Sequence, residues 1–216
     1  MSSPWFSLAI GLVMACMYGC KDRDHGPTPT PLDKTSAQSL GQQVYVASEP
    51  GVKTEAYVAA HRIGNDEFEQ FFYVYRVYRE SFKYVREVVD ALTSAEALFG
   101  AGQLSGDCED FAVGLLAITR VFDLSARVVF GDDEQGDGHA YLQVLVASND
   151  VQSKDGVGRR LAELGTNVTG IETDHDGAWL TLETFPPGAA LFSSERRRIL
   201  VFSTGQVDVR LSSATK

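Results

Sequence analysis

The chain is poor in cysteine and in basic residues. Only three of its 216 residues are cysteines, and two of them, Cys16 and Cys20, lie near the N-terminus. Cys108 thus has no disulfide partner within the body of the chain, which excludes a disulfide-stabilised fold. Nineteen Lys and Arg stand against 29 Asp and Glu, and the one basic run, three arginines at 196–198, is short. A nucleic-acid partner is therefore not expected.

The chain also lacks a run of about 20 apolar residues, the length that a helix needs to cross a bilayer. Residues 5–20 are uncharged and largely apolar and end at Lys21, which suits the hydrophobic part of a secretory signal. Two cysteines in it follow small residues, as in bacterial lipoprotein signals. We expect lipidation at Cys20, because a polar segment begins directly after it, with Cys16 as the alternative. An uncleaved apolar anchor is the competing interpretation, and either one predicts an exported, membrane-held protein.

Composition divides the chain into three parts. Residues 1–20 form the predicted signal. Residues 21–42 are polar, contain the sequence GPTPTP, and predict a disordered, partly extended tether. Residues 43–216 then form one predicted domain.

Periodicity within that domain predicts helices first and strands afterwards. Aromatic and aliphatic residues recur at helical spacing from Phe68 to Val89 and predict a helix from about residue 66 to 92, with its apolar face in the core. Further helices are expected, among them a short one before Gly100 and a buried one over 111–122. The predicted strands are 126–130, 139–147, 168–171, 178–182, 199–203 and 207–211. This order indicates an α+β fold with an antiparallel sheet.

Residues 106–112, with the sequence GDCEDFA, carry the most informative pattern. Asp107 suits a helix N-cap, which makes Cys108 the first helical residue. Amide groups and the helix dipole at that position stabilise a thiolate and lower the pKa of the thiol from about 8.5. Three acids, Asp107, Glu109 and Asp110, oppose this ionisation. We therefore expect their carboxylates to point away or to be offset by an imidazolium.

His139 is the histidine best placed to serve that cysteine, because it opens a predicted strand after Gly138. His25 lies in the tether, His61 in a poorly defined region, and His175 in a turn flanked by acids. A third group usually orients such an imidazole, and Glu183, at the end of strand 178–182, is the best candidate.

These segments resemble the bacterial and archaeal transglutaminase-like superfamily. The resemblance rests on GDCEDFA at 106–112, ARVVFG at 126–131 and GHAYLQV at 138–144, with GAWLTLE at 177–183 similar to a third motif. It implies a papain-like fold in which a helical part that carries the cysteine packs on an antiparallel sheet. It also implies Cys108 as nucleophile, His139 as general base and Glu183 as orienting acid, where the family usually has Asp. Gln103 is a weaker oxyanion donor by analogy with papain-like enzymes.

The sequence thus predicts a membrane-tethered, extracytoplasmic thiol enzyme that acts on amide bonds through a thioester. Resolution by water makes it a peptidase or amidase, and resolution by an amine makes it a protein-glutamine acyltransferase. The expected substrate is a protein, a peptide or cell-wall peptide, and no cofactor or metal is expected. The alternative is a catalytically weak or inactive domain that binds a peptide or protein.

Overall fold

The structure is a computed structural model that describes residues 34–85, 92–132, 138–146, 159, 161–162, 168, 170–173, 176–183 and 197–211. The predicted signal, with Cys16 and Cys20, and the tether up to residue 33 lie outside these residues. Within the described part of the chain, every helix is too short or too polar to span a bilayer.

A six-stranded antiparallel sheet forms the second half of the chain. Its strands, in spatial order, are β5 (Gly170–Thr173), β6 (Ala178–Leu182), β4 (Gly138–Val146), β3 (Ala126–Asp132), β7 (Arg197–Phe202) and β8 (Val207–Leu211). Each begins and ends within two residues of its predicted position. The expected α+β class and the closing β7–β8 hairpin are confirmed.

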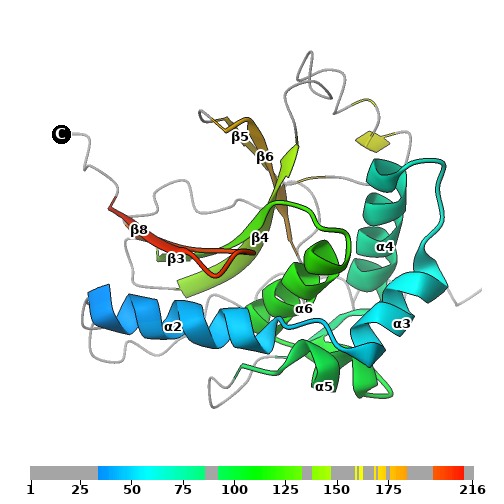
Figure 1. Ribbon diagram of the computed structural model, residues 1–216, viewed down its shortest axis with the longest axis horizontal. Helices are drawn as coiled ribbons and strands as arrows, with labels where there is room; N and C mark the ends of the chain where they lie inside the picture. The colour runs from blue at the N-terminus through cyan, green and yellow to red at the C-terminus, as the bar shows by residue number, and fades with distance from the viewer. Residues whose placement is uncertain are drawn as a thin grey trace, which may run out of the picture.

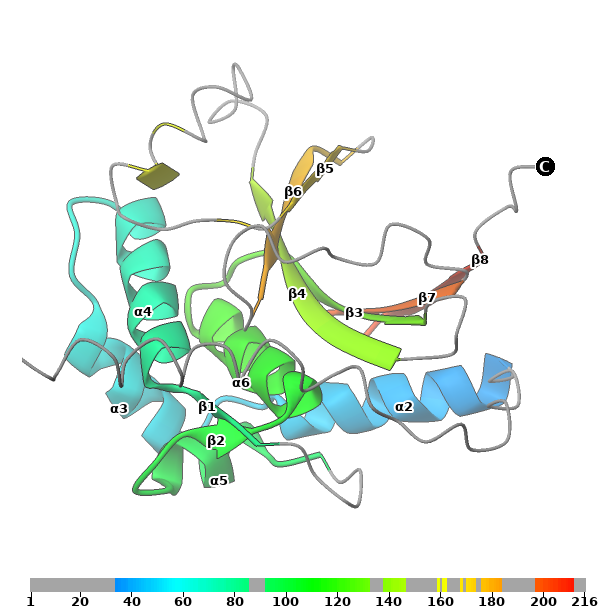
Figure 2. The same ribbon diagram turned by 180° about the vertical axis from the view of Figure 1, so that it is seen from behind.

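Helices cover one face of this sheet. They are α2 (Lys34–Ala47), α3 (Val52–His61), α4 (Glu67–Ser81), α5 (Ala95–Gly100) and α6 (Cys108–Val121). Figures 1 and 2 show α6 between the sheet and the group of α3, α4 and α5, while α2 runs beside β7 and β8. The main hydrophobic core lies between α6, α2 and this sheet face and continues between α6 and the helices α3, α4 and α5.

Helix α6 is buried because its sequence is apolar on nearly every side. Every residue from Phe111 to Thr119 is buried. Asp107 begins the helix as N-cap by accepting the N–H groups of Glu109 and Asp110. The helix ends before Asp123, whose φ of 54° is left-handed. These observations confirm the predicted N-cap and the buried helix.

Helix α4 is shorter than predicted. Asp66 caps its start by accepting the N–H of Glu69, but the helix ends at Ser81 rather than near residue 92. Phe82 is extended, and β1 (Lys83–Tyr84) pairs in parallel with β2 (Ser105–Gly106). The apolar spacing continues past Ser81, but pairing with a distant segment overrides it in residues 82–85.

The predicted tether is also wrong over residues 34–42, which are helical in α2. Ala37 and Val44 of this helix are fully buried, and a side chain at Gly41 would collide with Val207 of β8. The segment is polar in composition, but its few apolar residues form a narrow stripe that packs against the β7–β8 edge of the sheet.

Candidate active site

Cys108 is the first residue of α6, as predicted, and local contacts fix this helix end. Asp110, in the first turn, accepts the N–H of Thr93 at 2.8 Å and ties the preceding loop to the helix. A Cβ on Gly106 would lie 2.3 Å from the Asp110 carboxylate, so only glycine fits there. The GDCED segment thus combines a helix cap, a close backbone approach and the thiol.

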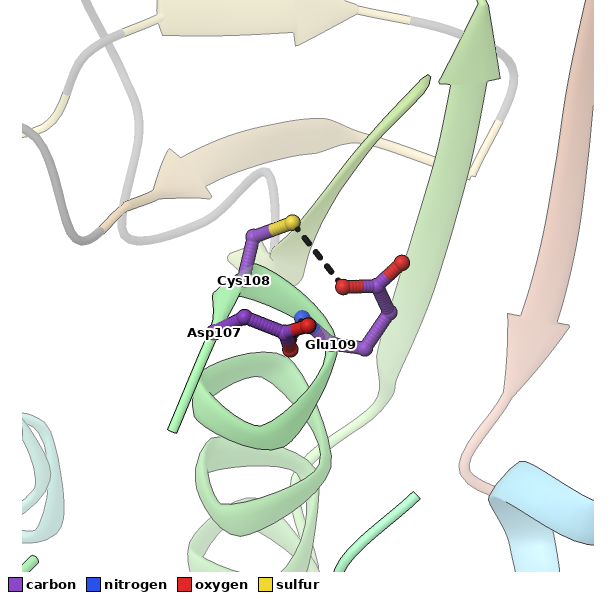
Figure 3. Close-up of side chains that lie close together, drawn as sticks. All are labelled: Asp107, Cys108 and Glu109. Atoms are coloured by element: carbon purple, nitrogen blue, oxygen red, sulfur yellow. Dashed lines mark hydrogen bonds between the residues drawn. The ribbon is translucent and has the colours of Figure 1, made fainter. Parts of the chain in front are cut away.

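The thiol of Cys108 lies in a buried and acidic environment, and the residue is only 6% exposed. It donates a hydrogen bond to Oε2 of Glu109 at 3.1 Å, and Figure 3 shows these two side chains pointing toward each other at the start of α6. Burial raises the pKa of Cys108 well above its ordinary value, and the Glu109 carboxylate raises it further. A hydrogen bond from the backbone of Ala140 acts in the opposite direction but is outweighed.

The expected lowering of the thiol pKa is therefore wrong. The helix N-terminus is present, but burial and the nearby Glu109 carboxylate raise the thiol pKa. The resting sulfur is accordingly a neutral thiol and not a preformed thiolate.

Asp107, Cys108 and Glu109 form a compact group of polar side chains (Figure 3). Burial, together with Glu109, raises the pKa of Asp107 to about 6. One potential ligand atom from each of the three lies within 4.8 Å of the others, and among the described residues this is the group that offers three metal donors together. Such a group by itself does not define a metal site.

His139 and Glu183 meet at the end of the sheet. Strands β4 and β6 pair Leu142 with Leu182, so His139 and Glu183 lie on one face as diagonal neighbours. Nε2 of His139 is 2.7 Å from Oε2 of Glu183, and both side chains are buried. With Glu183 ionised, its carboxylate only accepts, so the tautomer that fits this pair has its proton on Nε2 and leaves Nδ1 to take up another.

Cys108, at the start of α6, contacts strand β4, which also carries His139. Its sulfur accepts a hydrogen bond from the backbone of Ala140, the residue directly after His139. The structure thus joins His139 to Glu183 directly and sets Cys108 against the backbone beside that histidine. Gln103 lies in an exposed loop before β2.

Sequence reasoning missed two residues of this region. Of the two arrangements expected for Glu109, a carboxylate that points away from the sulfur is not the one found, because Glu109 accepts a hydrogen bond from Cys108. Tyr75 was interpreted only as part of an apolar helix face, but its hydroxyl bonds to the backbone of Glu183. No signal in the sequence links residues 75 and 183, which are 108 positions apart.

A family model described as the transglutaminase-like superfamily matches residues 57–158. This segment, slightly less than half of the chain, is therefore similar to a transglutaminase-like core, as the motifs predicted. The matched segment contains Cys108 and His139 and stops before Glu183. Together with the helix-on-sheet fold, it supports an enzyme of the cysteine-peptidase or transglutaminase type.

Two solved structures are distantly similar. One, described as a "Putative Cysteine Protease" from Cytophaga hutchinsonii, is 18% identical with a TM-score of 0.37 over 55% of this chain, which spans 42% of that chain. The other, Legionella pneumophila LapG, is 14% identical with a TM-score of 0.41 over 81% of this chain and 89% of that one. No curated protein sequence matches significantly. At these values neither structure identifies a substrate or a reaction.

Proposed function

We propose that this protein is a thiol enzyme that cleaves or exchanges amide bonds, with Cys108 as nucleophile, His139 as general base and Glu183 as orienting acid. One observation carries the proposal. Nε2 of His139 lies 2.7 Å from Oε2 of Glu183 in a buried pair, and the backbone of the strand that holds His139 contacts Cys108 at the start of α6. A carboxylate that holds one ring nitrogen directs the other toward proton transfer.

The raised pKa of Cys108 determines how the first step proceeds. Because the resting thiol is neutral, proton transfer from Sγ to Nδ1 of His139 accompanies attack of the sulfur on the carbonyl carbon. The C–S bond forms, and the carbonyl electron pair moves to oxygen. The N–H groups of Glu109 and Asp110 already donate to Asp107, so the N–H of Cys108 is the first-turn amide that we assign to this oxyanion.

Collapse of the intermediate breaks the C–N bond. His139 returns its proton to the departing amine, and the acyl group stays on Sγ as a thioester. Neutral His139 then activates water, which releases a carboxylic acid and restores the thiol. An amine in place of water gives a new amide, and we propose hydrolysis of a protein, a peptide or cell-wall peptide as the main outcome.

Alkylation of Cys108 by iodoacetamide across pH tests the proposed base. We expect the wild type to react faster near neutral pH than His139→Ala, and Cys108→Ala not to react at this position. Mass spectrometry of the modified peptide measures each rate. Equal rates and equal pH profiles in the wild type and His139→Ala would reject the enzyme.

A peptide- or protein-binding module is the second candidate function. The burial of Cys108 and its hydrogen bond to Glu109 favour it, because both suppress the nucleophile. This candidate function predicts that Cys108→Ala binds a peptide ligand as tightly as the wild type and that neither protein cleaves the peptide.

We further propose that the protein is held at the extracytoplasmic face of a bacterial membrane through lipid on Cys20. The uncharged segment 5–20 and the polar segment after it support this proposal. Labelled palmitate should enter the wild type in a bacterial host but not Cys20→Ser. Incorporation that persists in Cys20→Ser and disappears in Cys16→Ser would instead assign the anchor to Cys16.

A further inference from the structure

The backbone of Glu183 lies just beyond the end of its strand. The last residue of β6 that pairs with β4 is Leu182, and the last that pairs with β5 is Thr181. Glu183 is nevertheless buried, so its N–H and C=O groups require hydrogen-bond partners.

The phenol of Tyr75 supplies both partners. Its oxygen accepts the N–H of Glu183 at 3.3 Å, and its O–H donates to the C=O of Glu183 at 3.4 Å. One hydroxyl thus pairs with both backbone groups of Glu183, the residue whose carboxylate contacts His139. Burial raises the pKa of Tyr75 to about 12, so the phenol keeps its proton at any working pH.

Helix α4 is itself attached to the helix that carries the cysteine. One turn after Tyr75, the hydroxyl of Tyr78 donates to the carbonyl of Phe111 in α6 at 3.3 Å. The Tyr78 ring also stacks on Phe111, with ring centroids 4.9 Å apart. Helix α4 therefore contacts the Glu183 backbone through one tyrosine and the Cys108 helix through another.

We propose that Tyr75 is a positioning residue, which fixes the Glu183 carboxylate on His139 by hydrogen-bonding both backbone groups of Glu183. This inference rests on the proposed function and deepens it. A tyrosine that merely satisfied the core would affect stability alone, whereas a positioning tyrosine also sets the geometry of the histidine–carboxylate pair.

The test compares Tyr75→Phe with Tyr78→Phe in the purified protein. Both substitutions keep the ring and remove one buried hydroxyl from the same helix, so Tyr78→Phe is the matched control for lost stability. Glu183→Gln is the reference for a disrupted pair. The two readouts are the NMR resonance of the ring proton on Nε2 of His139, assigned by its loss in His139→Gln, and the rate of Cys108 alkylation by iodoacetamide.

In Tyr75→Phe we expect the His139 resonance to move toward its position in Glu183→Gln. We also expect alkylation to slow by roughly tenfold or more, because a displacement of about 1 Å in a reactive geometry costs up to about 10²-fold. Tyr78→Phe should lose similar stability and leave both readouts unchanged.

The positioning role would be overturned if Tyr75→Phe kept the His139 resonance and the alkylation rate of the wild type. It would also be overturned if Tyr75→Phe and Tyr78→Phe changed them equally. If Glu183→Gln changes the readouts and Tyr75→Phe does not, the inference about Tyr75 fails and the proposed function stands. If Glu183→Gln changes neither readout, the proposed triad fails, and the role of Tyr75 fails with it.

Discussion

Glu109 accepts a hydrogen bond from the sulfur that we propose as the nucleophile, and it suppresses the reactivity of that sulfur. Its carboxylate accepts the S–H of Cys108 and raises the thiol pKa by charge and by hydrogen bonding. A side chain of this kind keeps the thiol protonated until the carboxylate moves or is neutralised. The resting geometry is therefore that of a restrained nucleophile.

Glu109→Gln should accelerate alkylation of Cys108. Removing the charge lowers the thiol pKa, and each pKa unit multiplies the thiolate fraction about tenfold below the pKa, so we expect roughly a tenfold gain at neutral pH. Asp123→Asn, an exposed acid after the far end of α6, is the control and should have no effect. A slower or unchanged rate in Glu109→Gln would contradict the role of Glu109.

Asp107 should make stability depend on pH in the acid range. Its pKa in the folded protein is about 6 against an ordinary 3.8, so the folded state binds the proton more tightly. Its stabilising contribution is complete below about pH 4 and is lost as pH rises toward 6.

Asp107→Asn keeps a good N-cap and removes this titration. Thermal unfolding from acid to neutral pH should show the wild type losing stability relative to the variant as pH rises. The difference should be a few degrees at most, because the half-buried carboxyl is screened by solvent. A pH-independent difference in Tm would refute the assignment.

At the scale of elements, the close packing of α4 against α6 depends on Gly114. A Cβ on Gly114 would lie 2.3 Å from the Tyr78 hydroxyl and 2.6 Å from a Leu98 methyl carbon. Overpacking a core costs about 1–3 kcal/mol, whereas Gly-to-Ala in a helix gains about 1 kcal/mol.

Gly114→Ala should therefore destabilise the protein by about 1 kcal/mol in urea unfolding. In a Tyr78→Phe background the loss should be smaller, since the closest clashing atom is gone. Gly102→Ala is the control, because a Cβ there meets nothing within 4 Å. Equal losses from Gly114→Ala with and without the hydroxyl would argue against this packing.

The starts of α4, α5 and α6 were predictable because capping is local chemistry. Asp66, Ser94 and Asp107 each accept an N–H two or three residues later, and the composition around each predicts a helix start. The end of α4 was not predictable, since β1 pairs with a segment more than 20 residues away. The same limit applied to Tyr75 and Glu183, whose contact depends on the packing of the whole domain.

At the scale of the molecule, α2 is part of the domain. Arg120 of α6 donates to the carbonyl of Tyr45 at 2.9 Å and to the hydroxyl of Ser48 at 3.1 Å, and it pairs with Glu49. The polar composition of residues 34–42 predicted a tether, because a helix that buries only a few side chains needs few apolar residues. The sequence names catalytic candidates by residue type and motif order, but it does not contain the direction of a side chain such as that of Glu109.

Truncation tests whether α2 stabilises the domain. A chain that begins at residue 30 should unfold at the denaturant concentration of the full chain. A chain that begins at residue 50 loses Val44, whose burial alone contributes about 1.5–3 kcal/mol, and the contacts of Arg120. Identical unfolding midpoints for the two truncated chains would show that α2 does not stabilise the domain.

The most direct test of the central claim is acylation of Cys108 by p-nitrophenyl acetate, followed as a burst of p-nitrophenolate. A thiol nucleophile with a working base gives a burst of one equivalent per active protein, with the acetyl group on Cys108 in the mass spectrum. The account predicts that burst in the wild type, a slower one in His139→Ala and in Glu183→Gln, and none in Cys108→Ala. A burst that persists without Cys108, or that is equally fast without His139, would contradict it.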